Sequence, residues 1–219
     1  MQRPNLAEGE YYHIYNRGVN KRDIFLDDAD RSRFLFNILC FQGDVDIPNI
    51  NRLNIQHPML NIETQNIEKN LMAELVGFTL MSNHFHLIVG QTKNAGISRY
   101  MQRVLNSYTK YFNIKYKTSG HLFQGPYQLV HIEDNEQLLY LSAYVHRNIR
   151  DISRWKNNER NYPWSSYQDY LGQNRFPGLL RPQVIMEQMT GSDEYLELVE
   201  DSEAKGKSDG RDGLFNIGC

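Results

Sequence analysis

Two histidines separated by one residue, His84 and His86, are the side chains of this sequence best placed to do chemistry. They follow a Ser-Asn break within the β-rich stretch 75–90, a pattern that predicts a hairpin. Residues i and i+2 of a strand share a face, so two imidazoles about 7 Å apart could bind one metal ion with a third ligand from elsewhere. The alternative is a pair of histidines on a solvent-facing sheet, and the pair alone does not decide.

The hairpin itself carries two further expectations. Asn83 suits its turn, because asparagine tolerates the left-handed conformation that such turns need. Phe85, Leu87 and Val89 alternate with the histidines, so they should face a core.

A third ligand and a nucleophile could come from a helix that Asp134 caps and that runs to about residue 150. Tyr140, Tyr144 and Asn148 are spaced by four and share one face of it. An asparagine oxygen can bind a hard cation, and a tyrosine hydroxyl beside a metal-bound phosphodiester can act as a nucleophile. Tyrosines at helical spacing are also common packing residues, which is the alternative.

The elements around these residues predict the fold class. We expect a strand at 10–16, a helix capped at 27–28, the hairpin, a helix over 96–116, a strand at 126–132 and then the helix after Asp134. This order predicts an α+β, ferredoxin-like (βαββαβ) fold: an antiparallel four-stranded sheet with helices on one face, plus an appended helix that carries Tyr144. Short helices are expected at 182–189 and 193–199.

Composition favours an ordinary globular protein. The 219 residues are 40% hydrophobic and 23% charged, with a net charge of -2. There is no apolar run of about 20 residues and no signal-like N-terminus. Two cysteines, Cys40 and Cys219, form no disulfide framework, so we expect a cytoplasmic protein.

Charge is unevenly distributed along the chain. Residues 75–132 contain no Asp or Glu, whereas in 192–213 eight acidic residues outnumber three basic ones. Residues 202–213 are expected to be disordered. A local positive field suits a polyanion such as DNA. The alternative is a solvated helix face whose acidic partners come from elsewhere in the chain, which would give the same sequence pattern. The bases of the acid-free stretch are Lys93, Arg99, Arg103, Lys110, Lys115 and Lys117.

A set of segments, taken together, resembles a known family. They are YHIYNRG at 12–18, DIF at 23–25, MSNHFHL at 81–87, GHLFQG at 120–125, YVHRN at 144–148 and YPWSSY at 162–167. In this order they resemble the single-tyrosine HUH transposases, and most of all the REP-associated tyrosine transposases. The resemblance covers about residues 10–171. It favours the chemical interpretation of the histidine pair over the solvent-facing one.

The resemblance implies roles for matching positions. His84 and His86 match the metal-binding histidines, Tyr144 the nucleophile, and Asn148 the polar residue that completes the metal site. It implies Mg2+ or Mn2+, a 5′-phosphotyrosine intermediate, single-stranded DNA with a hairpin as substrate, a homodimer and a nucleoid-associated location. To the six bases above we add as expected DNA contacts Arg17, His121 and Gln124.

Two departures from the family pattern bear on function. Ile149 follows Asn148 where the family usually has proline, and residues 126–128 read Pro-Tyr-Gln where it has Arg-Tyr-Lys. The second change removes two phosphate-binding charges. It bears on DNA affinity and not on the chemistry. The alternative function is a domesticated DNA hairpin or single-strand binding protein without transposition activity. An RNA-recognition sheet is disfavoured, because its signature motif is absent from the sequence.

The extent of the family resemblance and the charge distribution also predict the domain organisation. Residues 1–175 form the transposase domain, with a long insertion at 41–74. Residues 176–219 form a helical extension with an acidic tail.

Overall fold

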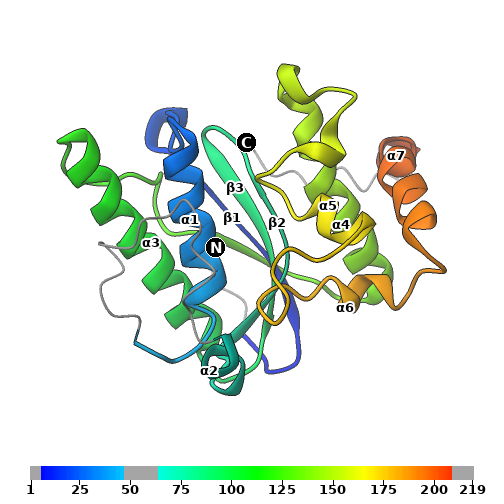
Figure 1. The fold of residues 1–219 in the computed structure, drawn as a ribbon, viewed down its shortest axis with the longest axis horizontal. Coiled ribbons are helices and arrows are strands. Elements are labelled where there is room, and N and C mark those ends of the chain that lie inside the picture. Colours follow the sequence, from blue (N-terminus) through cyan, green and yellow to red (C-terminus); the bar gives the residue numbers. More distant parts are fainter. Residues whose placement is uncertain (1–5, 47–63, 209–219) are drawn as a thin grey trace.

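The computed structural model describes residues 6–46 and 64–208, with side chains through Asp201. Its elements follow the predicted order (Figure 1). They are β1 (Tyr11–Arg17), η1 (Val19–Lys21), α1 (Asp28–Cys40), α2 (Thr64–Lys69), β2 (Ala73–Leu80), β3 (His84–Gln91), α3 (Gly96–Tyr116), β4 (Gln128–His131), α4 (Asn135–Arg147), η2 (Asn148–Asp151), η3 (Ser153–Trp155), η4 (Glu159–Asn161), α5 (Tyr167–Leu171), α6 (Gln183–Met186) and α7 (Ser192–Ser208).

The four strands form one antiparallel sheet in the order β2-β3-β1-β4. The β1–β3 register places Tyr15 opposite His86 and Arg17 opposite His84. β2 and β3 form the predicted hairpin, which a bond from the Met81 N–H to the His84 carbonyl closes at 2.9 Å. β4 is shorter than the predicted strand at 126–132, because Pro126 has no N–H to donate to a ladder.

One face of the sheet packs against α1 and α3 (Figure 1). Phe85, Leu87 and Val89 are buried in this core, as their alternation predicts. α1 begins at a capping box in which the Asp27 carboxylate accepts from the backbone N–H of Asp30. The stripe of α3 that is buried in this core consists of Ile97, Tyr100, Met101, Val104, Tyr108 and Phe112.

The other face packs against α4, so helices cover both sides of the sheet (Figure 1). Leu141 and Val145 of α4 belong to one apolar cluster with Ile88 of β3. Ile185 of α6 and Tyr195 of α7 are buried in the same cluster, which places the extension after residue 175 against α4. The side chains of the histidine pair lie on this second face, since they alternate with those in the first core.

Several local expectations can be compared with the structure. Asp134 caps α4 as predicted, and the 3-10 turn η2 continues it to residue 151. The expectation that Asn83 adopts a left-handed conformation is wrong. Asn83 is not among the non-glycine residues with positive φ in the described chain. Residues 202–208, expected to be disordered, are the last turns of α7.

Two expectations concern the ends of the described ranges. Helix α2 lies near the end of the 41–74 insertion, whereas 47–63 and the tail 209–219 lie outside the described residues. Among the described helices, none combines the length and apolar character needed to span a membrane.

Candidate active site

The two histidines of β3 lie side by side at the start of the strand. The ring centroids of His84 and His86 are 5.0 Å apart and the rings are perpendicular. His86 is fully buried, and His84 is partly exposed. Burial lowers the pKa of His84 to about 4, with a smaller contribution from the positive charge of Arg17, and it also lowers the pKa of His86. Both imidazoles are therefore neutral at physiological pH.

A neighbouring side chain determines which nitrogen of the His84 ring carries the proton. The Asn83 amide oxygen, which can only accept, lies 2.6 Å from Nδ1 of His84. Nδ1 of His84 must therefore donate, and its Nε2 keeps a lone pair. Nδ1 of His86 lies 3.0 Å from Nε2 of His13, a buried β1 residue.

His13 was not identified from the sequence, although it alternates with Tyr15 and Arg17 along β1. Its ring stacks on that of His86, with centroids 5.2 Å apart and planes 16° apart. Burial lowers the pKa of His13 to about 3, so this ring is also neutral. Period-2 alternation could have placed His13 on the same face as Tyr15. Its contact with His86 depends on the strand register, which only the folded sheet supplies.

Tyr144 lies beside the histidine pair. Its ring centroid is 6.0 Å from that of His86, in an edge-on arrangement. Asn148, one turn later, donates from its amide nitrogen to the backbone carbonyl of Tyr144 at 2.8 Å and so ends α4. This bond leaves the amide oxygen of Asn148 as the atom available to a cation. Helix α4 thus carries Tyr144 to the histidine pair, and Asn148 follows at its C-cap.

The rival nucleophiles differ in placement. Tyr108 is buried in the first core, on the opposite face of the sheet, where its hydroxyl donates to the carbonyl of Ile24. Burial raises the pKa of Tyr108 far above its ordinary value. Tyr140 lies one helical turn before Tyr144, nearer to the N-terminus of α4. Among the three tyrosines, the ring contact between His86 and Tyr144 favours Tyr144.

The donor atoms of the histidine pair suit a cation. The buried Nε2 atoms of His84 and His86 have no hydrogen-bond partner among the described residues. An unpaired buried nitrogen is costly, and a bound cation would satisfy both. Within the described chain no three His, Cys, Asp or Glu side chains converge as metal ligands.

Part of the predicted DNA-contacting set gathers at the same end of the sheet. Arg17, opposite His84 in the register, donates from Nε to the side-chain oxygen of Gln124 at 2.6 Å. Lys110 and His121 line a cavity of about 590 Å³ between the second half of α3 and the loop before β4. Lys117 is exposed at the C-terminus of the same helix.

The other predicted bases are paired or distant. Lys115 forms ion pairs with Asp27 and with the fully buried Asp30, both at 2.7 Å. Arg99 pairs with Asp44 at 3.0 Å. The acid-free stretch of sequence is thus not acid-free in space, because α1 and the segment after it supply the carboxylates.

Two more of these bases lie apart from the histidine pair. Arg103 donates to the carbonyls of Gly43 and Val45, and its guanidinium lies over the Phe41 ring. Lys93 follows the far end of β3, which by strand geometry is about 25 Å from the histidines.

Helix α4 is held in place by a buried histidine two residues after Tyr144. His146 Nε2 lies 2.7 Å from the Ser166 hydroxyl, and its Nδ1 lies 2.7 Å from the Tyr195 hydroxyl of α7. Ser166 in turn accepts from the backbone N–H of Phe78 in β2 at 2.8 Å. The network therefore ties α4 to the sheet and to α7 at once.

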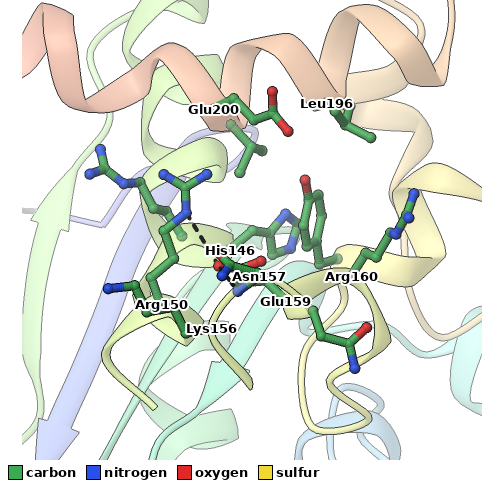
Figure 2. A pocket seen from close by; sticks show the side chains of 12 residues that line it. His146, Arg150, Lys156, Asn157, Glu159, Arg160, Leu196 and Glu200 are labelled. Carbon is green, nitrogen blue, oxygen red and sulfur yellow. Dashed lines mark hydrogen bonds and ion pairs between the residues drawn. The ribbon is translucent and has the colours of Figure 1, made fainter. Parts of the chain in front are cut away.

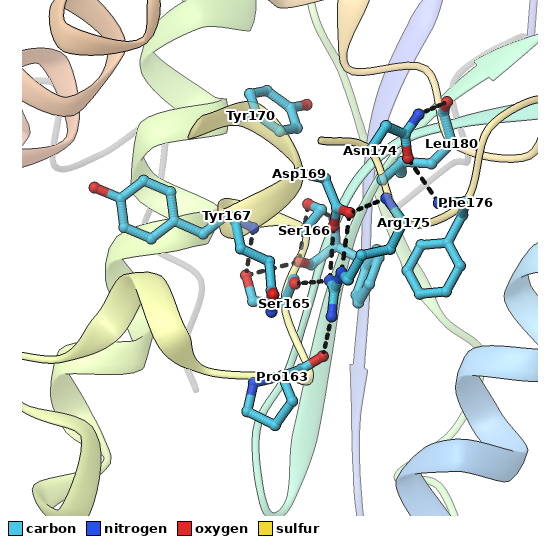
Figure 3. Close-up of polar contacts among 12 residues, drawn as sticks. Pro163, Ser165, Ser166, Tyr167, Asp169, Tyr170, Asn174, Arg175, Phe176 and Leu180 are labelled. Carbon is cyan, nitrogen blue, oxygen red and sulfur yellow. Dashed lines mark hydrogen bonds and ion pairs between the residues drawn. The ribbon is translucent and has the colours of Figure 1, made fainter. Parts of the chain in front are cut away.

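A second polar cluster holds the segment before α5 (Figure 3). Arg175 pairs with the buried carboxylate of Asp169 at 2.7 Å and also donates to the carbonyls of Pro163 and Ser165. Ser165 also bridges to Thr79 of β2. These contacts fix residues 163–165 against the sheet, close to the hairpin turn.

A cavity of about 500 Å³ lies between the end of α4, residues 156–160 and α7 (Figure 2). Arg150 and Glu159 form an ion pair at 3.5 Å on its wall. Its charged lining residues are Arg147, Arg150, Lys156, Glu159, Arg160 and Glu200. The lining does not include the histidine pair or Tyr144, so this cavity is separate from the candidate active site.

Comparisons with known proteins agree with this geometry. A family model described as "Transposase IS200 like" matches residues 9–148, which is more than half of the chain. A solved structure of a REP-associated tyrosine transposase bound to a REP hairpin is 12% identical, with a TM-score of 0.53, and covers 82% of this chain and 89% of that chain. At this identity the likeness concerns the fold.

A putative transposase from Deinococcus radiodurans R1 is also 12% identical, with a TM-score of 0.36, covering 73% of this chain and 98% of that one. No curated protein matches the chain significantly.

Proposed function

This chain belongs to the family of IS200-like transposases, and from that premise we propose that it cuts and rejoins single strands of DNA. Tyr144 is the nucleophile and forms a 5′-phosphotyrosine intermediate. The sheet order β2-β3-β1-β4 fits a ferredoxin-like core, with α4 as the appended helix that carries the tyrosine. The observation that carries this proposal is the contact of Tyr144 with a histidine pair whose buried Nε2 atoms have no partner in the described chain.

We propose that His84, His86 and Asn148 hold a divalent metal, Mg2+ or Mn2+. Bound there, the metal would offset negative charge on the oxygens of the scissile phosphate. The chain contributes two oriented imidazoles: Asn83 directs the lone pair of His84 Nε2, and the contact with His13 orients the ring of His86. Since both rings are neutral at pH 7, no proton has to leave before they bind the ion.

The cleavage step conserves bonds. A bond forms between the Tyr144 hydroxyl oxygen and phosphorus while the bond from phosphorus to the 3′-oxygen breaks. The tyrosine loses its proton to solvent, and the released 3′-oxygen gains one. Because the new phosphodiester keeps the energy of the old one, the 3′-hydroxyl can attack the tyrosine linkage at a second junction and rejoin DNA.

The proposed partner is single-stranded DNA with a hairpin. The solved relative is bound to a REP hairpin, and Lys110, Lys117, His121, Arg17 and Gln124 lie at the same end of this molecule as the histidine pair. A homodimer and a cytoplasmic, nucleoid-associated location belong to the same proposal.

A DNA hairpin-binding protein without transposition activity is the second candidate. The loss of two expected positive charges at Pro126 and Gln128, near the Arg17–Gln124 pair, bears on the DNA affinity of either candidate and not on the cleavage chemistry. Such a protein would bind DNA with the same sheet end but form no covalent link.

The deciding experiment is a covalent-adduct assay with a labelled single-stranded oligonucleotide that contains a hairpin and flanking DNA from the gene's own surroundings. Wild type should form a denaturation-resistant adduct that disappears with EDTA and returns with Mg2+ or Mn2+. Tyr144→Phe should abolish the adduct and keep DNA binding, because only a hydroxyl is lost.

Tyr140→Phe is the matched control, because it removes a hydroxyl from the same helix face one turn away from Tyr144. This variant should keep the adduct. Binding by wild type without any adduct would favour the second candidate. An adduct in Tyr144→Phe but not in Tyr140→Phe would move the nucleophile to Tyr140.

A further inference from the structure

A second cavity of about 590 Å³ opens directly beside the histidine pair. Its walls come from the hairpin turn, the start of α1 and the segment that leads from η2 to α5. His84 itself is part of the wall, so the cavity continues from the candidate active site. The lining residues are Asp28, Arg31, Met81, Ser82, Asn83, His84, Asp151, Ile152, Ser153, Arg154, Trp155, Tyr162, Pro163 and Trp164.

Aromatic rings form much of this wall. The sequence contains two tryptophans, Trp155 and Trp164, and both line the cavity, together with Tyr162. Both tryptophans are only partly buried, which leaves ring surface open to a ligand. Trp155 packs edge-on against the Tyr162 ring, with centroids 5.4 Å apart. An aromatic face that is partly exposed in a concavity is a suitable surface for stacking a flat ligand.

These walls are held in position before any ligand binds. The Tyr162 hydroxyl donates to the carbonyl of Leu80, and the carbonyl of Trp164 accepts from the Leu80 N–H at 2.9 Å. Arg175 holds the carbonyls on both sides of Trp164, those of Pro163 and Ser165 (Figure 3). These bonds attach the cavity walls to the strand end that carries the hairpin turn and His84. Because the walls are already ordered, ligand binding would cost little conformational entropy.

Two arginines add positive charge next to the rings. The Arg154 guanidinium lies over the Trp155 ring, 5.8 Å from its centroid. Arg31 pairs weakly with the exposed Asp28 at 3.5 Å, and its buried Nε has no partner among the described residues. Asp28 and Asp151 also line the cavity, so its formal charge is balanced. The rings supply the surface for a flat base, and the two guanidiniums are groups that a neighbouring phosphate can pair with, which together is the chemistry of a nucleotide.

We propose that this cavity is a subsite for one unpaired base of single-stranded DNA, at the nucleotide next to the phosphate held at His84. The inference rests on the proposed function, because it places the scissile phosphate at the histidine pair. The base stacks on the partly exposed tryptophan surface, and Arg31 or Arg154 pairs with the neighbouring phosphate. The subsite orients the strand for attack and tolerates different bases, since every base has a π-face.

Intrinsic fluorescence reports directly on the cavity, because both tryptophans line it. The probes are a twelve-residue oligothymidylate and an abasic phosphodiester of the same length and charge, both added without metal. Stacking should quench the fluorescence with oligothymidylate and should do so much less with the abasic strand. Equal quenching by the two probes, or none with oligothymidylate at saturating binding, would overturn the proposal.

Variants of Trp155 test the contribution of stacking. Trp155→Leu should weaken oligothymidylate binding by about 5- to 150-fold, and should leave binding of the abasic strand unchanged. Trp155→Phe is the matched control and should keep most of the affinity, because an aromatic face remains. A thermal melt of each variant shows whether it is folded. If Trp155→Leu is folded and binds both probes like wild type, the subsite is wrong.

This test can fail separately from the proposed function. Quenching that depends on the base, without any metal-dependent adduct, would keep the subsite and remove the cleavage chemistry. An adduct formed equally well by wild type and Trp155→Leu, with no base-dependent quenching, would keep the chemistry and remove the subsite.

Discussion

Replacing His146 should change how the stability of this protein depends on pH. The buried ring of His146 is neutral, and in that form it holds the helix that carries Tyr144. Burial lowers the pKa of His146 from about 6.5 to about 3. Between these values the unfolded chain binds the proton and the native protein does not, so stability falls as the pH drops through this window. From pH 7 to pH 5 the loss due to this one residue is about 2 kcal/mol.

His146→Phe removes the titrating group while keeping a flat ring against Tyr167, whose centroid is 5.2 Å away. At pH 7 the variant should be less stable by about 1–3 kcal/mol, because the hydroxyls of Ser166 and Tyr195 each lose a partner. At pH 5 that cost should shrink by about 2 kcal/mol, since only wild type is weakened by protonation of this residue in the unfolded chain.

The assay is urea unfolding of wild type and variant at pH 7 and pH 5. His13 and His84 titrate in both proteins, so their contributions cancel in the difference. Ser142→Ala is the control, because Ser142 accepts from Tyr195 in the same network without titrating in this range, and its cost should be the same at both pH values. A cost for His146→Phe that does not change with pH would refute the reasoning.

Three further predictions concern the site and its supports. Arg175→Gln should destabilise the protein by about 3–5 kcal/mol in denaturant unfolding, because it leaves a buried carboxylate unpaired; a cost below about 1 kcal/mol would contradict this. Lys110→Ala should reduce the log–log salt slope of DNA binding by about one unit, whereas Arg99→Ala, at the far end of α3, should leave it unchanged. The double variant His84→Ala/His86→Ala should lose Mn2+ binding in calorimetry, and unchanged stoichiometry would remove these residues from the metal site.

Local patterns of the sequence were sufficient to predict the four strands and the long helices α1, α3 and α4 in their order. The helix over 96–116 is α3 (Gly96–Tyr116), and Asp134 caps α4, because helical periodicity and capping depend only on neighbours in the chain. The alternation around His84 and His86 placed both rings on one face for the same reason, since successive strand residues point to opposite sides. The family resemblance added Tyr144, and its contact with His86 is consistent with that role.

Contacts between distant segments were decided only by the tertiary structure. His13 bonds to His86 because β1 lies antiparallel to β3 in one register, and no local pattern encodes that register. Lys115 is tied to Asp30 across α1 and α3, although no acid lies near it in the sequence. Trp155 reaches the cavity beside His84 only because the chain after α4 returns to the hairpin turn. Packing against the sheet, and no local sequence pattern, brings Trp155 and the turn together.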